Sequence, residues 1–112
     1  MSHRVYFYDD ASGVQRAADG AKPESLEEIL ALMDRVLQVP GSFVGVLAPD
    51  DSLLTFLVTG EGSVQMDVPQ PGRRGSYMKV SNLDACKDVM KRFAEAAAFV
   101  HSDFDGLAFE KW

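Results

Sequence analysis

Two segments with helical periodicity, residues 25–39 and 82–99, restrict the fold of this chain more than any other feature. In the first segment, Ser25 and Glu28 have the spacing of a capping box, in which each side chain accepts from a free amide of the first turn. Apolar residues then recur at spacings of three, four and seven up to a stop at Pro40. Each predicted helix therefore has one apolar face that must be buried.

The rest of the chain is organised into short segments of strand character. Six segments alternate or are rich in apolar, aromatic and β-branched residues: 4–8, 42–48, 53–59, 63–68, 76–80 and 107–112. The run 42–48 is too short for an independent helix and is typical of a strand buried on both faces. Residues 9–23 and 69–75 are rich in Gly, Pro and polar residues, which predicts loops, the first with a short hairpin return through Val14 and Arg16.

This order of elements predicts an α+β fold. We expect an antiparallel sheet meander of five to six strands, with the two amphipathic helices packed on one face. The chain has 112 residues, so it forms a single domain spanning 1–112, because a second core would not fit. The other face of the sheet would then be solvated or used for binding.

The charge and the single cysteine limit the compartment and the partners. Cys86 lies on the apolar stripe of the second helix, which favours a buried thiol in a protein of the reducing cytoplasm. We expect no signal peptide and no membrane span, because no apolar run is long enough for either. The net charge of -6 argues against a nucleic-acid partner and in favour of a basic protein.

Most of the negative charge lies in residues 1–69, which contain four basic and eleven acidic side chains. We interpret four of these acids as a partner-binding edge on the meander, meeting Lys or Arg of a basic partner: Asp50, Asp51, Glu61 and Asp67. Turn chemistry alone also explains Asp50 and Asp51, and an acidic surface that only keeps the protein in solution is the alternative. Trp112 is either a plug on the sheet or an exposed interface anchor.

The sequence contains no catalytic, metal or cofactor motif that we can identify. His3 and His101 lack zinc-type ligand spacing, and no activated serine motif is present. We therefore expect no enzyme, no metal and no cofactor, with an active site assembled only by the fold as an open alternative. A second alternative is a small cytoplasmic ligand-binding or regulatory module, in which Arg73 and Arg74 of the Gly72–Gly75 loop hold a phosphate or carboxylate.

The chain resembles immunity-protein family one of the bacterial polymorphic toxin systems in the order of four segments: SLEEILALMDRVL, FVGVLAPDDSLLTFLVTGEGSVQMDV, NLDACKDVMKRFAEA and LAFEKW. The resemblance covers residues 25–112 and depends on element order, hairpin punctuation and the terminal Trp. It implies a cytoplasmic antitoxin without catalytic residues, which binds and blocks a cognate toxin domain, often a nuclease or nucleic-acid deaminase. It says nothing about the oligomeric state.

Overall fold

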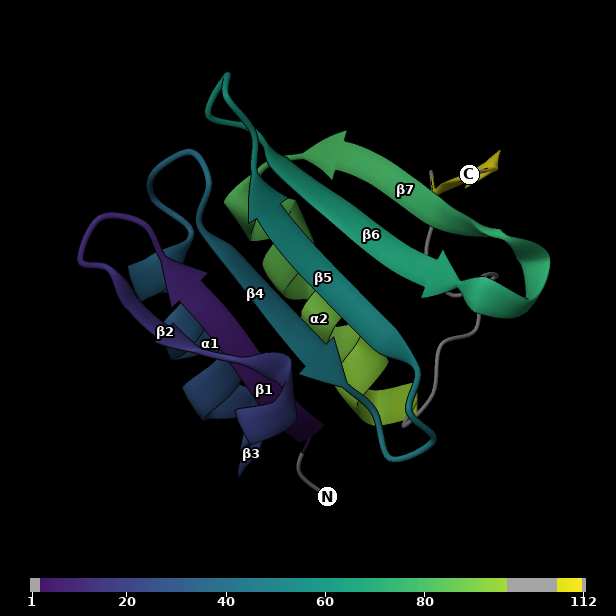
Figure 1. The fold of residues 1–112 in the computed structure, drawn as a ribbon, viewed down its shortest axis with the longest axis horizontal. Helices are drawn as coiled ribbons and strands as arrows, with labels where there is room; N and C mark the ends of the chain where they lie inside the picture. The colour runs from purple at the N-terminus through teal and green to yellow at the C-terminus, as the bar shows by residue number, and fades with distance from the viewer. Residues whose placement is uncertain (1–2, 97–106, 112) are drawn as a thin grey trace.

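The computed structural model describes residues 3–96 and 107–111, and in them two α-helices cover one face of an antiparallel sheet. Figure 1 shows both helices, α1 (Leu26–Val36) and α2 (Leu83–Ala96), behind the strands. α1 packs against β1 and β4, and α2 packs against α1 and β6. The predicted α+β class, with both helices on one face, is confirmed.

Within the described residues the sheet contains eight strands instead of the predicted five to six. In chain order they are β1 (His3–Asp9), β2 (Val14–Arg16), β3 (Lys22–Glu24), β4 (Phe43–Leu47), β5 (Leu53–Val58), β6 (Val64–Gln70), β7 (Gly75–Ser81) and β8 (Ala108–Lys111). Across the sheet the order is β2-β1-β4-β5-β6-β7-β8, and β3 also pairs with β1. Strands β4 to β7 form the predicted meander, because each is hydrogen-bonded to the next along the chain.

The difference in strand number comes from the edge next to β1. The hairpin return through Val14 and Arg16 is confirmed as β2, but the prediction of a loop over the rest of 9–23 misses β3. A three-residue strand that contains Pro23 has no periodicity of its own. It is a strand because it pairs with the edge of β1, and such tertiary pairing is not visible in local sequence.

The predicted loop over 69–75 is wrong at both ends. Strand β6 continues to Gln70, a short 3-10 helix spans Pro71–Arg73, and β7 begins at Gly75. Pro69 pairs with Ser76 within the ladder. A proline is tolerated there because it lies near the end of the strand and removes a single ladder donor.

The helix boundaries follow their capping residues. The capping box of α1 is present: Ser25 N donates to Glu28 at 2.9 Å, and Glu28 N donates to Ser25 Oγ at 3.2 Å. α1 ends at Val36, before the predicted residue 39. α2 begins after Asn82, whose side chain accepts from Ala85 N at 2.9 Å. The predicted end of this helix at residue 99 lies outside the described residues, as does Trp112.

The core lies between the helices and one face of the sheet, which we call the covered face. Alternate strand residues point into it and are 0–3% exposed: Val5, Val44, Val46, Leu54, Phe56, Val58, Val64, Met66 and Val68. They meet the apolar stripes of both helices: Ile29, Met33 and Val36 of α1, and Cys86, Met90 and Phe93 of α2. Within the described residues, neither helix is long and apolar enough to cross a membrane.

Candidate functional site

The face of the sheet on which no helix of the described residues lies, here called the open face, is the first candidate site. Strand alternation and cross-strand pairing arrange its side chains in three rows. The first row contains Tyr8, Phe43, Leu57, Gln65 and Val80; the middle row Tyr6, Gly45, Thr55, Asp67, Met78 and Ala108; the third row Arg4, Leu47, Leu53, Pro69, Ser76 and Glu110.

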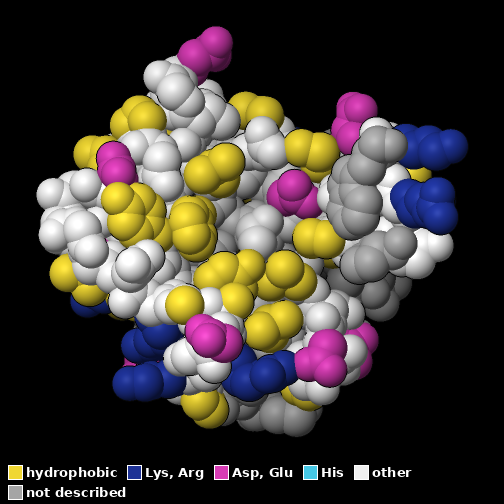
Figure 2. Space-filling model, in the orientation of Figure 1, with side chains coloured by type: hydrophobic (Ala, Val, Ile, Leu, Met, Phe, Trp, Pro, Cys, Tyr) yellow, Lys and Arg dark blue, Asp and Glu magenta, His cyan; other side chains and the backbone are white. Residues whose placement is uncertain are grey.

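The open face is apolar over much of its area. Phe43 contacts both neighbouring tyrosines, with ring centroids 6.2 Å from Tyr6 and 5.9 Å from Tyr8. Leu57 is 39% exposed and Val80 is 58% exposed. Figure 2 shows hydrophobic side chains across the middle of this face, with most charged side chains nearer its rim. Contiguous apolar surface of this kind is typical of a binding face.

The middle row contains a close approach that depends on a glycine. A Cβ atom at Gly45 would lie 2.1 Å from Cζ of Tyr6, so only glycine lets the Tyr6 ring lie across β4. Next in the row, Thr55 Oγ1 donates to the main-chain oxygen of Asp67 at 3.0 Å. The row therefore has a phenol, a hydroxyl and a carboxylate within an apolar surround.

Asp67 is the electrostatic centre of the open face. Its Oδ1 atom is buried and accepts no hydrogen bond from any described residue. Burial raises the pKa of Asp67, and a side-chain hydrogen bond with Ser76 opposes that shift. Burial also raises the pKa of Tyr6, and the negative charge of Asp67 adds to this effect. The surroundings thus disfavour the charged form of this carboxylate.

Two hollows lie at the margins of the open face. One, of about 400 Å³, is lined by the β4–β5 turn and the end of β6: Leu47, Asp50, Asp51, Ser52, Leu53, Pro69 and Gln70. The other, of about 390 Å³, lies towards β7 and β8 and is lined by Gln65, Met78, Lys79, Val80 and Glu110. Both combine apolar walls with charged side chains, as protein interfaces do.

Asp50 and Asp51 lie together in the β4–β5 turn, beside the first hollow. Asp50 Oδ1 accepts from Ser52 N at 2.9 Å. A side-chain hydrogen bond with Ser52, together with this backbone one, keeps the pKa of Asp50 below its usual value. Asp51 has a left-handed backbone, φ 69°, and its carboxylate pairs with Arg4 of the open face. Both acids therefore have a role in the turn and still line the margin of the open face.

Glu61 is far from these two residues in the sheet. It lies in the β5–β6 turn, and consecutive turns of an antiparallel meander fall at opposite ends of the strands. Asp67 belongs to the middle row, between the two ends. The four predicted acids thus form no continuous edge; Asp67 lies in the face, with Asp50 and Asp51 at one end and Glu61 at the other.

The predicted anion-binding arginines have different surroundings. The Arg73 guanidinium lies 4.3 Å from the ring centroid of Phe109 and 5.5 Å from that of Tyr77, and it donates to the Tyr77 hydroxyl. It thereby packs the β6–β7 connection against β8. Arg74 is exposed with φ 52°. Because Arg73 is engaged by aromatic rings, anion binding by this pair stays a prediction without a contact in its favour.

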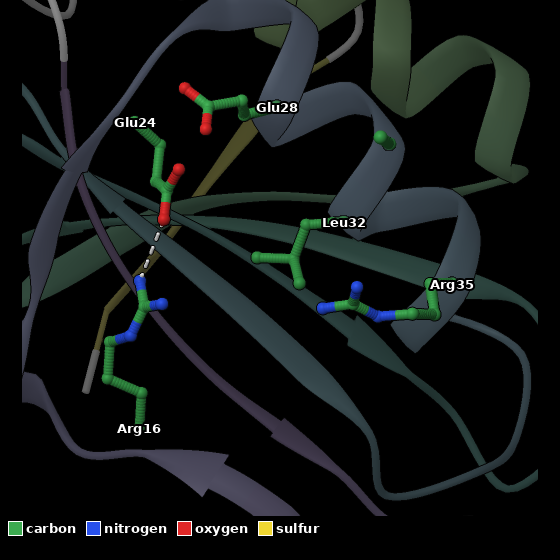
Figure 3. Close-up of a pocket in the computed structure, with 6 residues that line it drawn as sticks. Arg16, Glu24, Glu28, Leu32 and Arg35 are labelled. Atoms are coloured by element: carbon green, nitrogen blue, oxygen red, sulfur yellow. Dashed lines mark hydrogen bonds and ion pairs between the residues drawn. The ribbon is translucent and has the colours of Figure 1, made fainter.

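A third hollow, of about 260 Å³, lies on the helix side between α1 and strands β2 and β3. Figure 3 shows Leu32 between the side chains of Arg16 and Arg35, with Glu24 paired to Arg16. The Arg16–Glu24 distance is 3.2 Å, and Arg16 also donates to Val5 O at 3.2 Å. These contacts hold two short strands against β1 and α1, so the hollow is explained by folding interactions.

The remaining reactive groups of the described residues are buried. Burial raises the pKa of the Cys86 thiol to about 12, and Cys86 is 0% exposed, which confirms the prediction of a buried thiol. His3 is also buried against Phe93, with ring centroids 5.4 Å apart, and burial lowers its pKa. No group of three metal-ligating side chains occurs among the described residues.

The apolar residues of the open face are what sequence reasoning missed. The sequence of 42–48 predicts a strand buried on both faces, and this prediction is wrong. In β4, Val44 and Val46 point to the helices and are buried, whereas Phe43 and Leu47 point to the open face and are partly exposed. The signal that we missed is the number of helices available to cover the two faces of the sheet. Two helices can cover one face of such a sheet, so apolar residues on both sides of β4 and β5, interrupted only by Gly45 and Thr55, predict an apolar open face.

The chain has no significant match among protein-family models, curated proteins or solved structures.

Proposed function

We propose that this chain is a protein-binding inhibitor of the immunity-protein type, which neutralises a cognate bacterial toxin domain in the cytoplasm by docking on it with the open face. The observation that carries the proposal is the apolar open face of an otherwise acidic chain, with the partly exposed Asp67 in its middle row and the Oδ1 atom of that residue buried. Apolar surface centred on desolvated polar groups is where protein interfaces concentrate their binding energy.

The charge distribution supports a basic partner. Asp50 and Asp51 border the open face at the β4–β5 turn, and Asp67 lies within it. Negative groups in and around an apolar face steer a positively charged surface into contact and disfavour wrong partners. Toxin domains that act on nucleic acid have basic active sites, because they must bind phosphates. A chain with these acids would cover such a site by presenting negative charge to it.

The test uses a toxin domain encoded in a reading frame next to this one, produced in bacteria with or without the chain. We expect the wild-type chain to restore growth and to purify with the toxin domain as a one-to-one complex. Val80→Arg, in the open face, should abolish both effects. Val14→Arg is the matched control, because Val14 is 56% exposed and Val80 58%, and Val14 lies beside Asp9 on the helix side of the sheet.

Two results would count against the proposal. If the chain neither protects nor binds, it is not the antitoxin of that toxin. If Val80→Arg protects as well as Val14→Arg, the partner binds another surface. Thermal melts of both variants establish that each is folded, so that a loss of protection reflects binding.

A further inference from the structure

We propose that the middle row of the open face is a socket for an arginine side chain of the partner, with the Asp67 carboxylate as its acceptor. The inference deepens the proposed function, because it specifies the chemistry of the partner at the centre of the interface. Three features of the structure support it: the shape of the row, the Oδ1 atom of Asp67 without a hydrogen-bond donor, and the Tyr6 ring in the same row.

The shape of the row encloses the acceptor: Asp67 as a residue is partly exposed, but its Oδ1 atom is covered by neighbouring side chains in the free protein. Thr55 and Met78 are its direct cross-strand neighbours, and Gln65 and Pro69 are its neighbours along β6 on the same face. Thr55 is small, and its hydroxyl is tied to the Asp67 main chain. Met78 is long and flexible, and side-chain rotamer changes are common at interfaces, so a long, thin partner side chain would reach Oδ1 when Met78 turns aside.

One oxygen of the acceptor is unsatisfied in the free protein, while the Asp67 carboxylate keeps a side-chain hydrogen bond with Ser76. The Oδ1 atom of Asp67 has no hydrogen-bond donor among the described residues, and none of the ion pairs recorded in that part of the chain includes Asp67. A buried carboxylate oxygen without a donor is costly, and the cost is recovered when a cation donates to it. A cationic side chain of a partner would therefore supply the hydrogen-bond donor that Oδ1 of Asp67 lacks.

The aromatic neighbours favour arginine over lysine. Tyr6 lies across Gly45 in the same row, and it is near enough for the charge of Asp67 to raise its pKa further, after burial. Phe43 packs against Tyr6 on the side of β4 and β1. A guanidinium group is weakly hydrated, stacks on aromatic rings and offers paired donors to a carboxylate, whereas an ammonium group is strongly hydrated. The protein already uses such stacking, since Arg73 lies 4.3 Å from the Phe109 ring centroid.

A second copy of the chain is a poorer occupant. Two open faces packed together would bring two unpaired Asp67 carboxylates into one interface, and each chain has a net charge of -6. Like charges in an apolar contact repel strongly, and net charge of this size opposes self-association. Charge complementarity therefore selects a cationic partner, and self-association becomes an outcome of the test.

The first experiment measures the affinity of the purified toxin complex. Asp67→Asn keeps the shape and removes the charge, and we expect it to weaken binding by about 30-fold or more, as for a buried charge pair that loses one member. Glu61→Gln removes an equal charge from the remote β5–β6 turn and should change affinity less than about threefold. Unchanged affinity of Asp67→Asn, with affinity lost in Val80→Arg, would overturn the arginine socket but retain the docking face.

The second experiment needs no toxin. The probes are two tripeptides, acetyl-Leu-Arg-Leu-amide and the same peptide with citrulline, which has the shape of arginine without its charge. We expect the arginine peptide to shift the NMR signals of Thr55, Asp67 and Met78 saturably, and the citrulline peptide or the Asp67→Asn protein to give no such shifts. Equal shifts from both peptides would overturn the proposal.

The two experiments separate the inference from the function on which it depends. Specific shifts with the arginine peptide, without protection from the toxin, would support the socket and reject the toxin assignment. Light scattering of the free protein at high concentration provides the remaining outcome. A dimer that Val80→Arg dissociates would assign the open face to a second copy and overturn the arginine socket.

Discussion

The two faces of the sheet are built from the same strands and differ in what lies against them. Phe56 and Val58 point to the covered face and are 0% and 3% exposed, whereas Leu57 between them points to the open face and is 39% exposed. Both faces have apolar side chains near the centre of the sheet, and in the described residues helices lie on one face alone. Apolar strand residues therefore define where a layer can pack, and the number of helices decides whether one does.

Three buried polar atoms have no partner among the described residues: Nε2 of His3 on the covered face, Oδ1 of Asp67 on the open face and Oγ1 of Thr59 in the β5–β6 turn. The first two allow the faces to be compared. His3 is closed off by Phe93 of α2, so it belongs to the fold. Asp67 lies on the face that no helix of the described residues covers, where a docking partner would meet it, although its Oδ1 atom is covered by neighbouring side chains in the free protein. The unpartnered atom of His3 thus belongs to the core, whereas the unpartnered atom of Asp67 belongs to the proposed docking face.

The two faces should differ most in the free energy of unfolding that is lost when an apolar side chain is replaced by alanine. Phe56→Ala should lower the free energy of unfolding by about 3–5 kcal/mol, because it opens a cavity beneath the helices. Leu57→Ala, the next residue on the opposite face, should cost about 1 kcal/mol or less. Urea denaturation of both variants measures the two values. Similar losses would mean that the open face contributes to the fold as much as the covered face does.

A smaller effect should appear where the open face is tightly packed. Gly45→Ala places a methyl group against the Tyr6 ring and should cost about 1–3 kcal/mol through overpacking. In a Tyr6→Ala background the same change should cost much less, because the obstructing ring is gone. Gly60→Ala is the control, since no atom lies within 4 Å of a Cβ at that position. Additive losses from Tyr6 and Gly45 would show that their contact is not the cause.

Much of the fold follows from local sequence. The capping box at Ser25, the apolar stripes of both helices and the alternation of β1, β5 and β6 are each visible without a structure. What local sequence does not contain is pairing between distant segments. The strand β3 exists because β1 has a free edge, and the row from Tyr6 to Asp67 exists because β4 and β5 lie between their strands.

The candidate site was predictable in part. Asp67 is visible as an acid on the polar side of an alternating strand, but its burial depends on neighbours from β5 and β7. Tyr6 and Val80 carry no functional signal in sequence, because only register places them on the same face as Asp67. Glu61 shows the reverse case: it is close to Asp67 in sequence and at a distant turn in the structure.

The covered face should respond to acid through His3. Its pKa in the folded protein is lowered from 6.5 by burial, so the unfolded chain takes up a proton first as the pH falls. The contribution of His3 is therefore complete above pH 6.5 and is lost as the pH falls through the lower, folded pKa. We expect the urea midpoint to decrease between pH 7.5 and 5.5 in the wild type, and to decrease less in His3→Gln.

His101→Gln removes the other histidine of the chain and is the control for the His3 effect. This variant should retain the decrease in midpoint. A wild-type midpoint that does not change over the same pH range would contradict the burial of a neutral His3 ring. A decrease of equal size in His3→Gln would assign the pH response to other groups.

The smallest expected effect, and one of opposite sign, belongs to Asp67 on the open face. Its pKa is raised from 3.8 in the folded protein, so the stability it contributes is present below pH 3.8 and is lost as the pH rises through the folded pKa. At pH 7 the charged, partly unsatisfied carboxylate opposes folding. Asp67→Asn should therefore raise the free energy of unfolding at pH 7, by about 1 kcal/mol at most. The gain should shrink as the pH is lowered towards 4.

Glu61→Gln gives the matched comparison, because it removes the same charge from an exposed turn and should change stability by less than about 0.5 kcal/mol at either pH. The result is most informative together with the binding data. A residue that belongs to the fold loses stability and function together when it is changed. If Asp67→Asn makes the free protein more stable and the complex weaker, Asp67 contributes to partner binding and lowers the stability of the free fold. If it destabilises the free protein at pH 7, the carboxylate has a structural role, and the open face loses its distinguishing feature.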